Sequence, residues 1–368
     1  MRAPKLIVSL VLLFSTISAR AYPELARHGY ANCSACHVSP SGGGLTTAYG
    51  RSLAKELLSH WGEEGEERFL YKVTPPEWLN VGGDIRAIQT YVDTSTFQQE
   101  KFFEMQTDLE VAVKFKNFFA DATFGVQEGP DGTPNRGHFL SRRHYLGYQV
   151  NDETAVRAGR FYPAFGINAA NHSIYTRKDI GFDEGSETDN IEASYSGEKF
   201  DYFATAILGR VDDYKSDWQR GGAISSSYFL SDKYKIGLSY LHANLKTAAR
   251  DLFAAYAIFG FSKSLYLLSE IDLQWMRDLT DSTASPHGAV TFQQLNYEWT
   301  QGFHVYAVAE LSNLNVGEVL TRKDSWGFGT QLFPRPHIDF ELEYRKERAM
   351  SLYSSYYDTA WALLHYYL

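Results

Sequence analysis

The chain has few cysteines and methionines, no long apolar run and no excess of basic residues. Its 368 residues contain no stretch of about 18 or more consecutive apolar residues, so helical membrane spans are excluded. The formal net charge of −9 leaves no basic surface for nucleic acid, which is therefore not expected as a partner. Only two cysteines and four methionines occur, so any cysteine chemistry is confined to one place.

Aromatic residues, by contrast, are abundant. The chain has 25 Tyr and 24 Phe, and aromatics make up 15% of it. Tyrosine is favoured in strands and at a membrane–water boundary, where one end of the ring is apolar and the other wet. The composition therefore favours an all-β protein in contact with a membrane.

The first 21 residues have the pattern of a secretory signal peptide. Arg2 and Lys5 give a positive start, residues 6–14 are apolar, and Ala19-Arg20-Ala21 gives a small-x-small cleavage site. The mature chain is expected to begin at Tyr22. The apolar run is too short for a helical span, although a retained N-terminal anchor is the alternative.

Both cysteines lie in the pattern Cys33-Ser34-Ala35-Cys36-His37, which is the attachment signature for c-type haem. Two thiols at this spacing can form thioethers with the two vinyl groups of one porphyrin, and the next histidine can bind the iron. The pattern predicts one haem c, held by Cys33 and Cys36, with His37 as proximal ligand. A Cys33–Cys36 disulfide and a zinc site are the alternatives, but neither explains the adjacent histidine.

The second axial ligand is less determined. Apart from Met1, the first methionine is Met105, so the usual His/Met pair has no local methionine. His28 and His60 are the candidates for this metal-binding role. Either would give a low-potential bis-histidine haem, and neither would leave an open, reactive iron.

A helix over about residues 47–61, ended by Gly62, is expected after the motif. On it, Tyr49, Leu53, Leu57 and His60 would share one face that covers the porphyrin. The preceding Gly42-Gly43-Gly44 lacks Cβ atoms and suits a close approach of backbone to a flat cofactor, or serves as a plain linker. With little apolar sequence to enclose the ring, one haem edge should stay exposed, which favours electron exchange with another protein.

After residue 77 the helical period gives way to alternation of apolar and polar residues, as in residues 105–116 and 337–345. About sixteen strand-like runs follow. Very short connections alternate with longer polar ones, which is typical of a transmembrane barrel. The short connections are 116–117, 151–152, 197–198, 231–232, 301–302 and 334–336.

The sequence therefore predicts three parts: a signal peptide (1–21), a short, mainly helical haem-binding segment in the periplasm (22–77) and an antiparallel transmembrane β-barrel (78–368). An even strand count places both barrel ends on the side of the haem. The last residues, 360–368, alternate like the closing strand of an outer-membrane barrel, although they end in Leu368 in place of the usual Phe. A periplasmic β-sandwich is the alternative, but its connections would not alternate in length.

In strand count and loop position the barrel resembles the general porins, whose loop after strand five folds into the lumen and narrows it. Here the fifth run covers about residues 154–162 and is followed by the long connection 165–187. The resemblance implies a constriction in which loop acids face basic residues of neighbouring strands; an ordinary surface loop is the alternative. The acids are Asp179, Asp183, Glu184 and Glu187, and the basic residues are Arg142, Arg143, Arg157 and Arg160.

Residues 24–51, ELARHGYANCSACHVSPSGGGLTTAYGR, resemble the leader of bacterial outer-membrane proteins that fuse a monohaem segment to a porin-like barrel. The arrangement is also similar to porin–cytochrome complexes. The resemblance implies a protein of the Gram-negative outer membrane that takes part in periplasmic or trans-outer-membrane electron transfer. Its partners would be outer-membrane lipid and a periplasmic or multihaem cytochrome, because one haem cannot bridge a hydrocarbon layer of about 30 Å. A homotrimer is possible.

Two other functions remain open. One is a passive solute-diffusion porin, in which the N-terminal segment is structural or a docking module. The other is a haem enzyme such as a peroxidase. The sequence has no nucleophile–base motif, phosphate-binding glycine loop or zinc-protease signature, so no enzymatic activity is expected.

Overall fold

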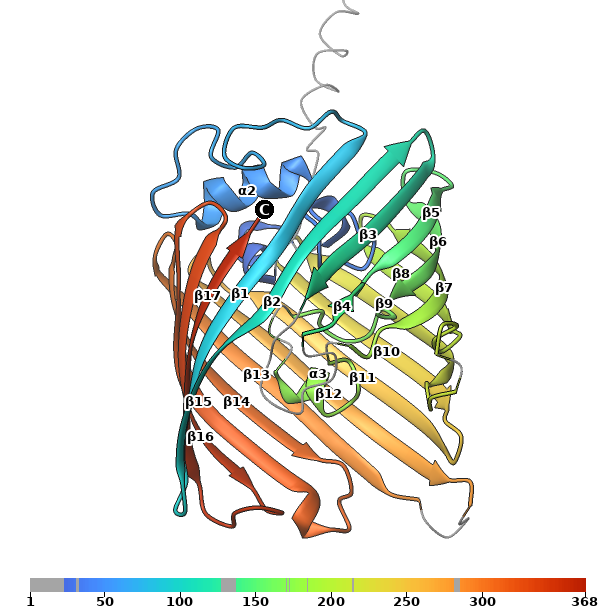
Figure 1. Cartoon of the computed structure of the whole chain (residues 1–368), viewed down its shortest axis with the longest axis vertical. Helices are drawn as coiled ribbons and strands as arrows, with labels where there is room; N and C mark the ends of the chain where they lie inside the picture. The colour runs from blue at the N-terminus through green and yellow to red at the C-terminus, as the bar shows by residue number, and fades with distance from the viewer. Residues whose placement is uncertain are drawn as a thin grey trace, which may run out of the picture.

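The computed structural model describes residues 23–30, 33–126, 137–169, 171, 173–183, 185–213, 215–280 and 285–368. The strands form one antiparallel sheet that closes on itself, because β1 pairs with both β2 and β17 (Figure 1). The two-residue β4 lies beside β3 just before β5 takes its place, so sixteen longer strands surround the lumen, as predicted. The strands are β1 Leu79–Asp93, β2 Gln98–Phe115, β3 Phe118–Val126, β4 Phe139–Leu140, β5 His144–Gln149, β6 Thr154–Phe161, β7 Thr188–Ser196, β8 Phe200–Ile207, β9 Arg220–Ser231, β10 Tyr234–Asn244, β11 Ala248–Gly260, β12 Leu265–Asp278, β13 His287–Thr300, β14 Phe303–Asn313, β15 Arg322–Arg335, β16 Ile338–Ala349 and β17 Tyr357–Tyr367.

The strand faces have the polarity of a membrane barrel. On β12, Ile271 keeps 47% of its surface exposed, whereas its neighbours Glu270 and Asp272 keep only 2% and 1%. Successive side chains point to opposite faces, so the apolar set lies outside and the polar set inside. A single closed sheet with this polarity corrects the alternative of a β-sandwich, whose two sheets would bury their apolar faces against each other. In the described residues no helix is long and apolar enough to cross a membrane.

Connections of different length lie at the two ends of the barrel. One end, here called the short-turn end, carries the turns 116–117, 150–153, 197–199, 232–233, 261–264, 301–302 and 336–337. The opposite end carries the longer connections, with short exceptions at 94–97 and 245–247. The N-terminal segment and the C-terminus both lie at the short-turn end, at the top of Figure 1, as the even strand count predicted.

The barrel closes where its first and last strands meet. The backbone N–H of Leu368 donates to the carbonyl of Gly83 at 2.9 Å. His365 on β17 contacts Asp84 on β1 at 2.7 Å and Asp339 on β16 at 3.0 Å. A Cβ atom on Gly82 would lie 2.3 Å from the Leu368 carbonyl oxygen and 2.4 Å from the Leu45 side chain, so three segments converge here.

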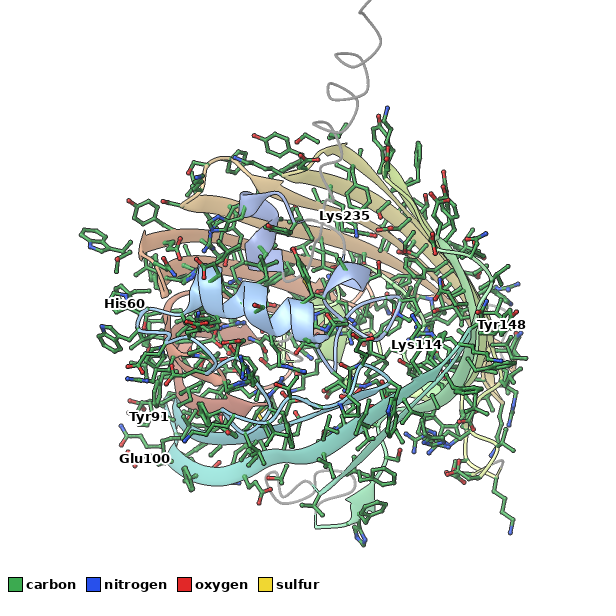
Figure 2. All side chains as sticks on the ribbon, turned by 90° about the horizontal axis from the view of Figure 1, so that it is seen from above. His60, Tyr91, Glu100, Lys114, Tyr148 and Lys235 are labelled. Carbon is green, nitrogen blue, oxygen red and sulfur yellow. The ribbon has the colours of Figure 1, made fainter. Side chains whose placement is uncertain are left out.

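The N-terminal segment lies across the mouth of the barrel (Figure 2). It consists of the 3₁₀ helices η1 (Pro23–His28) and η2 (Cys33–Ala35), the helix α2 (Ala48–Leu58) and irregular chain that leads to β1. The side chain of Thr47 caps α2 by accepting from the Gly50 N–H at 3.1 Å. The helix ends at Leu58, with Ser59 as its C-cap, and does not reach Trp61 as predicted, because His60 N–H donates to the Phe333 carbonyl and Trp61 N–H to that of Pro334.

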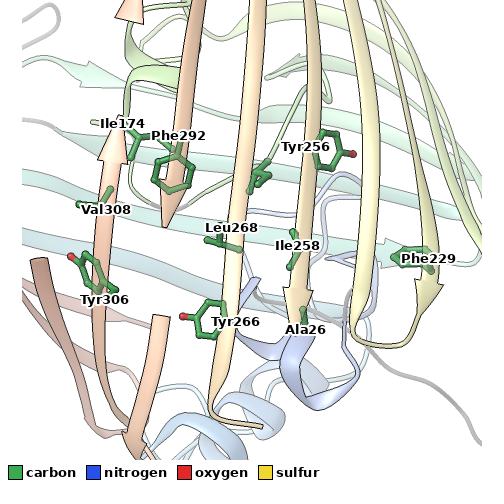
Figure 3. Close-up of a cluster of buried hydrophobic side chains, with 11 residues drawn as sticks. Ala26, Ile174, Phe229, Tyr256, Ile258, Tyr266, Leu268, Phe292, Tyr306 and Val308 are labelled. Carbon is green, nitrogen blue, oxygen red and sulfur yellow. The ribbon is translucent and has the colours of Figure 1, made fainter. Parts of the chain in front are cut away.

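The connection after β6 folds into the lumen, as the porin resemblance implied. It carries the short helix α3 (Tyr175–Lys178). Ile167 and Ile174 of this connection pack with Phe292 and Val308 of the inner wall in one buried cluster (Figure 3). Inward-facing carboxylates also hold it: Glu270 accepts from the Ile167 N–H at 2.8 Å, and Glu310 accepts from that of Tyr175 at 3.1 Å. Residues 162–187 are called the lumen loop below.

Candidate haem site and channel interior

The second cysteine of the attachment motif is packed beneath α2. Cys36 is fully buried. A Cβ atom on Gly50 would lie 2.7 Å from the Cys36 Cβ, so only glycine allows the helix this close. The Thr47 N–H donates to the Cys36 carbonyl at 2.7 Å, which fixes the start of α2 directly on the motif.

His37 is held in the state that a metal ligand requires. Its Nδ1 lies 3.1 Å from the Gly44 carbonyl oxygen. A carbonyl can only accept, so Nδ1 carries the proton and the neutral ring keeps its lone pair on Nε2. Burial lowers the pKa of His37 to about 4, against an effect of the Gly44 hydrogen bond in the other direction, so the ring is neutral at neutral pH.

These residues fit one c-type haem in their donor chemistry. The buried Cys36 thiol is followed in the chain by the neutral imidazole of His37, whose Nδ1 is hydrogen-bonded to a backbone carbonyl. Such a hydrogen bond is the usual support for a histidine that binds a metal through its other nitrogen. Within the described ranges, no group of three or more His, Cys, Asp or Glu side chains is arranged to hold a metal ion. The described residues therefore offer no set of ligands for the alternative of a zinc site.

The two candidates for the second axial ligand lie in different places. His28 is half-buried, and its Nε2 accepts from the Arg27 Nε–H at 3.1 Å. Burial, followed by the Arg27 charge, lowers the pKa of His28 to about 4. The other charges that act on it lie near β10, β11 and β13, whereas those that act on His37 lie near β1, β2 and β5.

His60 lies at the rim of the barrel, as Figure 2 shows. Its ring is exposed, and its Nδ1 contacts the Gln301 carbonyl oxygen at 2.7 Å. The expected helix face does not carry His60, because the helix ends before it. On that face Tyr49 is 44% exposed, whereas Leu53 and Leu57 are partly buried against the cluster that contains Leu58. The buried residues are Gly50, Arg51, Ala54 and Leu58.

Three consecutive glycines after the motif adopt left-handed conformations. Gly42, Gly43 and Gly44 have φ values of 80°, 75° and 65°. A Cβ atom on Gly44 would lie 2.5 Å from the Arg143 guanidinium carbon, and one on Gly43 would lie 2.8 Å from the Asn168 amide nitrogen. The glycines therefore let the backbone approach side chains of the barrel interior closely. The sequence analysis had considered only an approach to a flat cofactor or a plain linker.

The four arginines singled out in the sequence have partners on barrel strands. Arg157 and Arg160 are directly opposite Glu192 and Asp189 in the β6–β7 register, which places the side chains within reach. The ion-pair distances are 2.8 Å for Arg142–Asp108, 2.7 Å for Arg143–Glu110, 2.6 Å for Arg157–Glu192, 3.1 Å for Arg160–Asp189 and 2.5 Å for Arg160–Asp212.

The acids of the lumen loop have basic partners that the sequence analysis did not single out. Asp179 pairs with Lys323 at 2.9 Å, and Glu187 contacts Arg210 at 3.4 Å. The Asp183 carbonyl accepts from the Tyr162 hydroxyl at 2.5 Å. Glu184 and the expected signal peptide lie outside the described residues. Which acidic and basic side chains form ion pairs in the lumen thus depends on the strand register as well as on the charges of the loop.

The N-terminal segment is tied to the barrel by contacts that sequence reasoning missed. Arg27 is fully buried, forms an ion pair with Glu298 at 2.9 Å and lies over the Tyr266 ring. Arg335 at the end of β15 pairs with Glu66, two strands along the rim from Glu298 on β13. These partners are more than 230 residues apart in the chain, so no local pattern could reveal them.

Neither a family model nor a curated protein sequence matches the chain. Solved structures do match it. The trimer form of OmpT, an outer membrane protein of Vibrio cholerae, is 10% identical with a TM-score of 0.56, over 79% of this chain and 99% of that one. The anion-selective porin from Comamonas acidovorans is 11% identical with a TM-score of 0.58, over 79% and 99%. The outer membrane channel DcaP of Acinetobacter baumannii is 13% identical with a TM-score of 0.55, over 79% and 97%. The likeness shows that the chain has a porin-like fold.

Proposed function

We propose that the chain is a porin-like protein of the Gram-negative outer membrane that carries one haem c at its short-turn end and takes part in electron transfer. The apolar outer face of the barrel and its likeness to outer-membrane porins support the location. The single observation that carries the haem is the geometry of His37, which follows Cys36 directly and donates its Nδ1–H to Gly44. The barrel places this segment on the side of its short turns, which are periplasmic in membrane barrels.

The bound haem would supply one-electron redox chemistry. The chain's own residues do the rest. Cys33 and Cys36 would hold the group covalently, and His37 would bind it through Nε2, because its Nδ1 proton is committed to the Gly44 carbonyl. Gly50 lets α2 lie directly on Cys36, so the motif is held on a regular helix and not on mobile chain. His28 and His60 remain the candidates for the second axial position.

Electron transfer across the membrane would need a further protein. The motif lies at one end of the barrel, and a hydrocarbon layer is about 30 Å thick. We therefore expect a periplasmic or multihaem cytochrome as redox partner. As in the trimer form of OmpT, three copies could assemble in the lipid of the outer membrane.

The test is an absorption spectrum of the protein purified from outer membranes, oxidised and then reduced with dithionite, with a pyridine haemochrome assay. The expected result is a covalent haem at one equivalent per chain. The Cys36→Ala variant should lose about half of the thioether links, and His37→Ala should change the axial-ligand spectrum while haem stays attached. A colourless wild-type protein made with a haem-attachment system present would exclude the electron-transfer function.

A passive solute channel with a structural N-terminal segment is the second candidate. The firm contacts Arg27–Glu298 and Arg335–Glu66 favour it, since they give the segment a role in the barrel without any cofactor. A deletion strain that grows normally with every electron acceptor but takes up small solutes more slowly would support this candidate over the first. Enzymatic activity is not expected from either.

A further inference from the structure

Six residues that follow the haem motif reach into the barrel and touch two parts of its interior. Residues 39–44, here called the glycine arm, begin two residues after His37 and end at Gly44. One side of the arm contacts the arginines of β6 and of the chain before β5, and the other contacts the lumen loop. The arm thus joins the segment across the mouth to the narrow part of the lumen.

The contact with the barrel wall is made by Arg157. Its two terminal nitrogens donate to the hydroxyls of Ser39 at 3.0 Å and Ser41 at 2.9 Å. Arg157 itself is fixed by Glu192 and by the Phe161 ring, whose centroid is 3.9 Å from the guanidinium carbon. The arm is therefore bound to a rigid group and not to a flexible surface side chain.

The contact with the lumen loop is made by Asn168. Its Nδ2 donates to the Gly42 carbonyl at 3.0 Å. Gly43 lies so close that a Cβ atom there would be 2.8 Å from the same nitrogen. Since Glu270 accepts from the backbone of Ile167, the next residue in the chain, Asn168 is held at the inner wall.

We propose that the N-terminal segment is the gate of the channel and that the glycine arm is its latch. With the arm docked on Arg157 and Asn168, a solute that crosses the lumen is obstructed twice, by the segment across the mouth and then by the lumen loop. Release of the arm opens a path for small hydrophilic solutes. Three hydrogen bonds hold the arm to the barrel, and its three left-handed glycines can change backbone conformation without the Cβ clashes of other residues.

The rim contacts are of a different kind and would stay in place when the arm moves. Arg27–Glu298 is buried, and the His60 region adds backbone hydrogen bonds to Phe333 and Pro334. The segment is therefore anchored at its two ends and latched in its middle. The three bonds between the arm and the barrel involve neither Cys36 nor His37, so their test is separate from that of the electron-transfer function.

The test measures solute flux through the full-length protein in proteoliposomes, by the rate of swelling in a small neutral sugar. The variant Ser39→Ala/Ser41→Ala/Asn168→Ala removes the three latch bonds. The matched control is Ser52→Ala, an exposed serine on the outer side of α2. We expect the triple variant to swell about tenfold faster, which corresponds to a shift of about 1.4 kcal/mol between closed and open states. Ser52→Ala should swell at the wild-type rate.

Folding is checked on the same samples by the heat-dependent migration of the barrel in gels. The single variant Asn168→Ala changes an exposed side chain only and should swell about threefold faster, so it keeps the test decisive if the triple variant misfolds. Folded Asn168→Ala or triple-variant barrels that swell at the wild-type rate would overturn the proposal. So would a wild-type protein that already conducts as fast as the variants. A haem spectrum of each sample reports separately on the electron-transfer function.

Discussion

At the scale of single residues, the environment of His37 decides what the motif can do. An imidazole that is neutral, oriented and protonated on Nδ1 is prepared for a metal, whereas the same histidine in water would be partly protonated near pH 6.5. The motif and the identity of His37 could be predicted from the sequence, because the signature is local. The Gly44 partner could not, because it depends on three left-handed glycines.

Acid should loosen the N-terminal segment. In the haem-free chain, His28 and His37 both have pKa values lowered to about 4 from 6.5, so below pH 6.5 the unfolded segment binds more protons than the folded one. The stability that these neutral rings allow is complete above about pH 6.5 and falls as the pH drops towards 4. Hydrogen–deuterium exchange, corrected for its intrinsic pH dependence, should show faster exchange in residues 33–58 at pH 4.5 than at pH 7.5. Equal protection at both values would contradict this.

His60 is expected to act as a tether for the segment. Its Nδ1 donates to the Gln301 carbonyl on an exposed part of the rim. His60→Ala should leave the haem spectrum unchanged while cleavage of residues 59–78 by a protease becomes about three- to tenfold faster, as expected for the loss of about 1 kcal/mol. His28→Ala, which removes the other candidate for the second axial position, is the matched variant. A spectral change in His60→Ala alone would assign the second axial position to His60 and overturn the tether.

At the scale of elements, the sequence predicted the strands more accurately than it predicted the helix. Period-two alternation predicted the strands because every strand has a lipid face and a lumen face. The helix was predicted to reach residue 61 but ends at Leu58, where Phe333 and Pro334 take over the backbone hydrogen bonds. A tertiary contact of this kind has no signal in the local sequence.

The closing strand depends on one histidine. His365 bridges Asp84 and Asp339, so it holds β17 to its two neighbours at once. His365→Ala leaves two carboxylates without this partner, and we expect a loss of about 1.5–3 kcal/mol in the free energy of unfolding. The measurement is the temperature at which the folded barrel is lost in gel migration. Exposed His287 on β13 gives the control, and a His365→Ala barrel as heat-resistant as His287→Ala would refute this role.

At the scale of the whole molecule, strand number and closure could be predicted from periodicity and connection length, and the inward fold of the lumen loop from the resemblance to the general porins. The position of the N-terminal segment across the mouth could not. It depends on pairs such as Arg27 with Glu298 on β13 and Ser39 with Arg157 on β6, which join the segment to strands far away in the sequence. For the same reason the partners of the lumen arginines depended on strand register, which the sequence left open.

The trimer put forward in the proposed function can be tested on the intact protein. The barrel is similar to the trimer form of OmpT, and large apolar side chains such as Phe102 and Phe115 are more than 70% exposed on its outer face. We expect a mass of three chains by light scattering in mild detergent, with dissociation to single folded barrels on moderate heating. A single-chain mass at every detergent concentration would contradict the trimer.

The contact of Leu45 and Leu368 with Gly82 implies an order of steps in the assembly of the protein. Leu45 belongs to the segment that contains the cysteines, Gly82 lies on the first strand, and Leu368 follows the last strand, β17. A contact among these three requires β17 to pair with β1, so we expect the segment to be seated in the same step that closes the barrel. Any group joined to Cys36 would then have to be attached beforehand, while the thiol can still be reached. Maturation of the N-terminus thus becomes a checkpoint for insertion into the membrane.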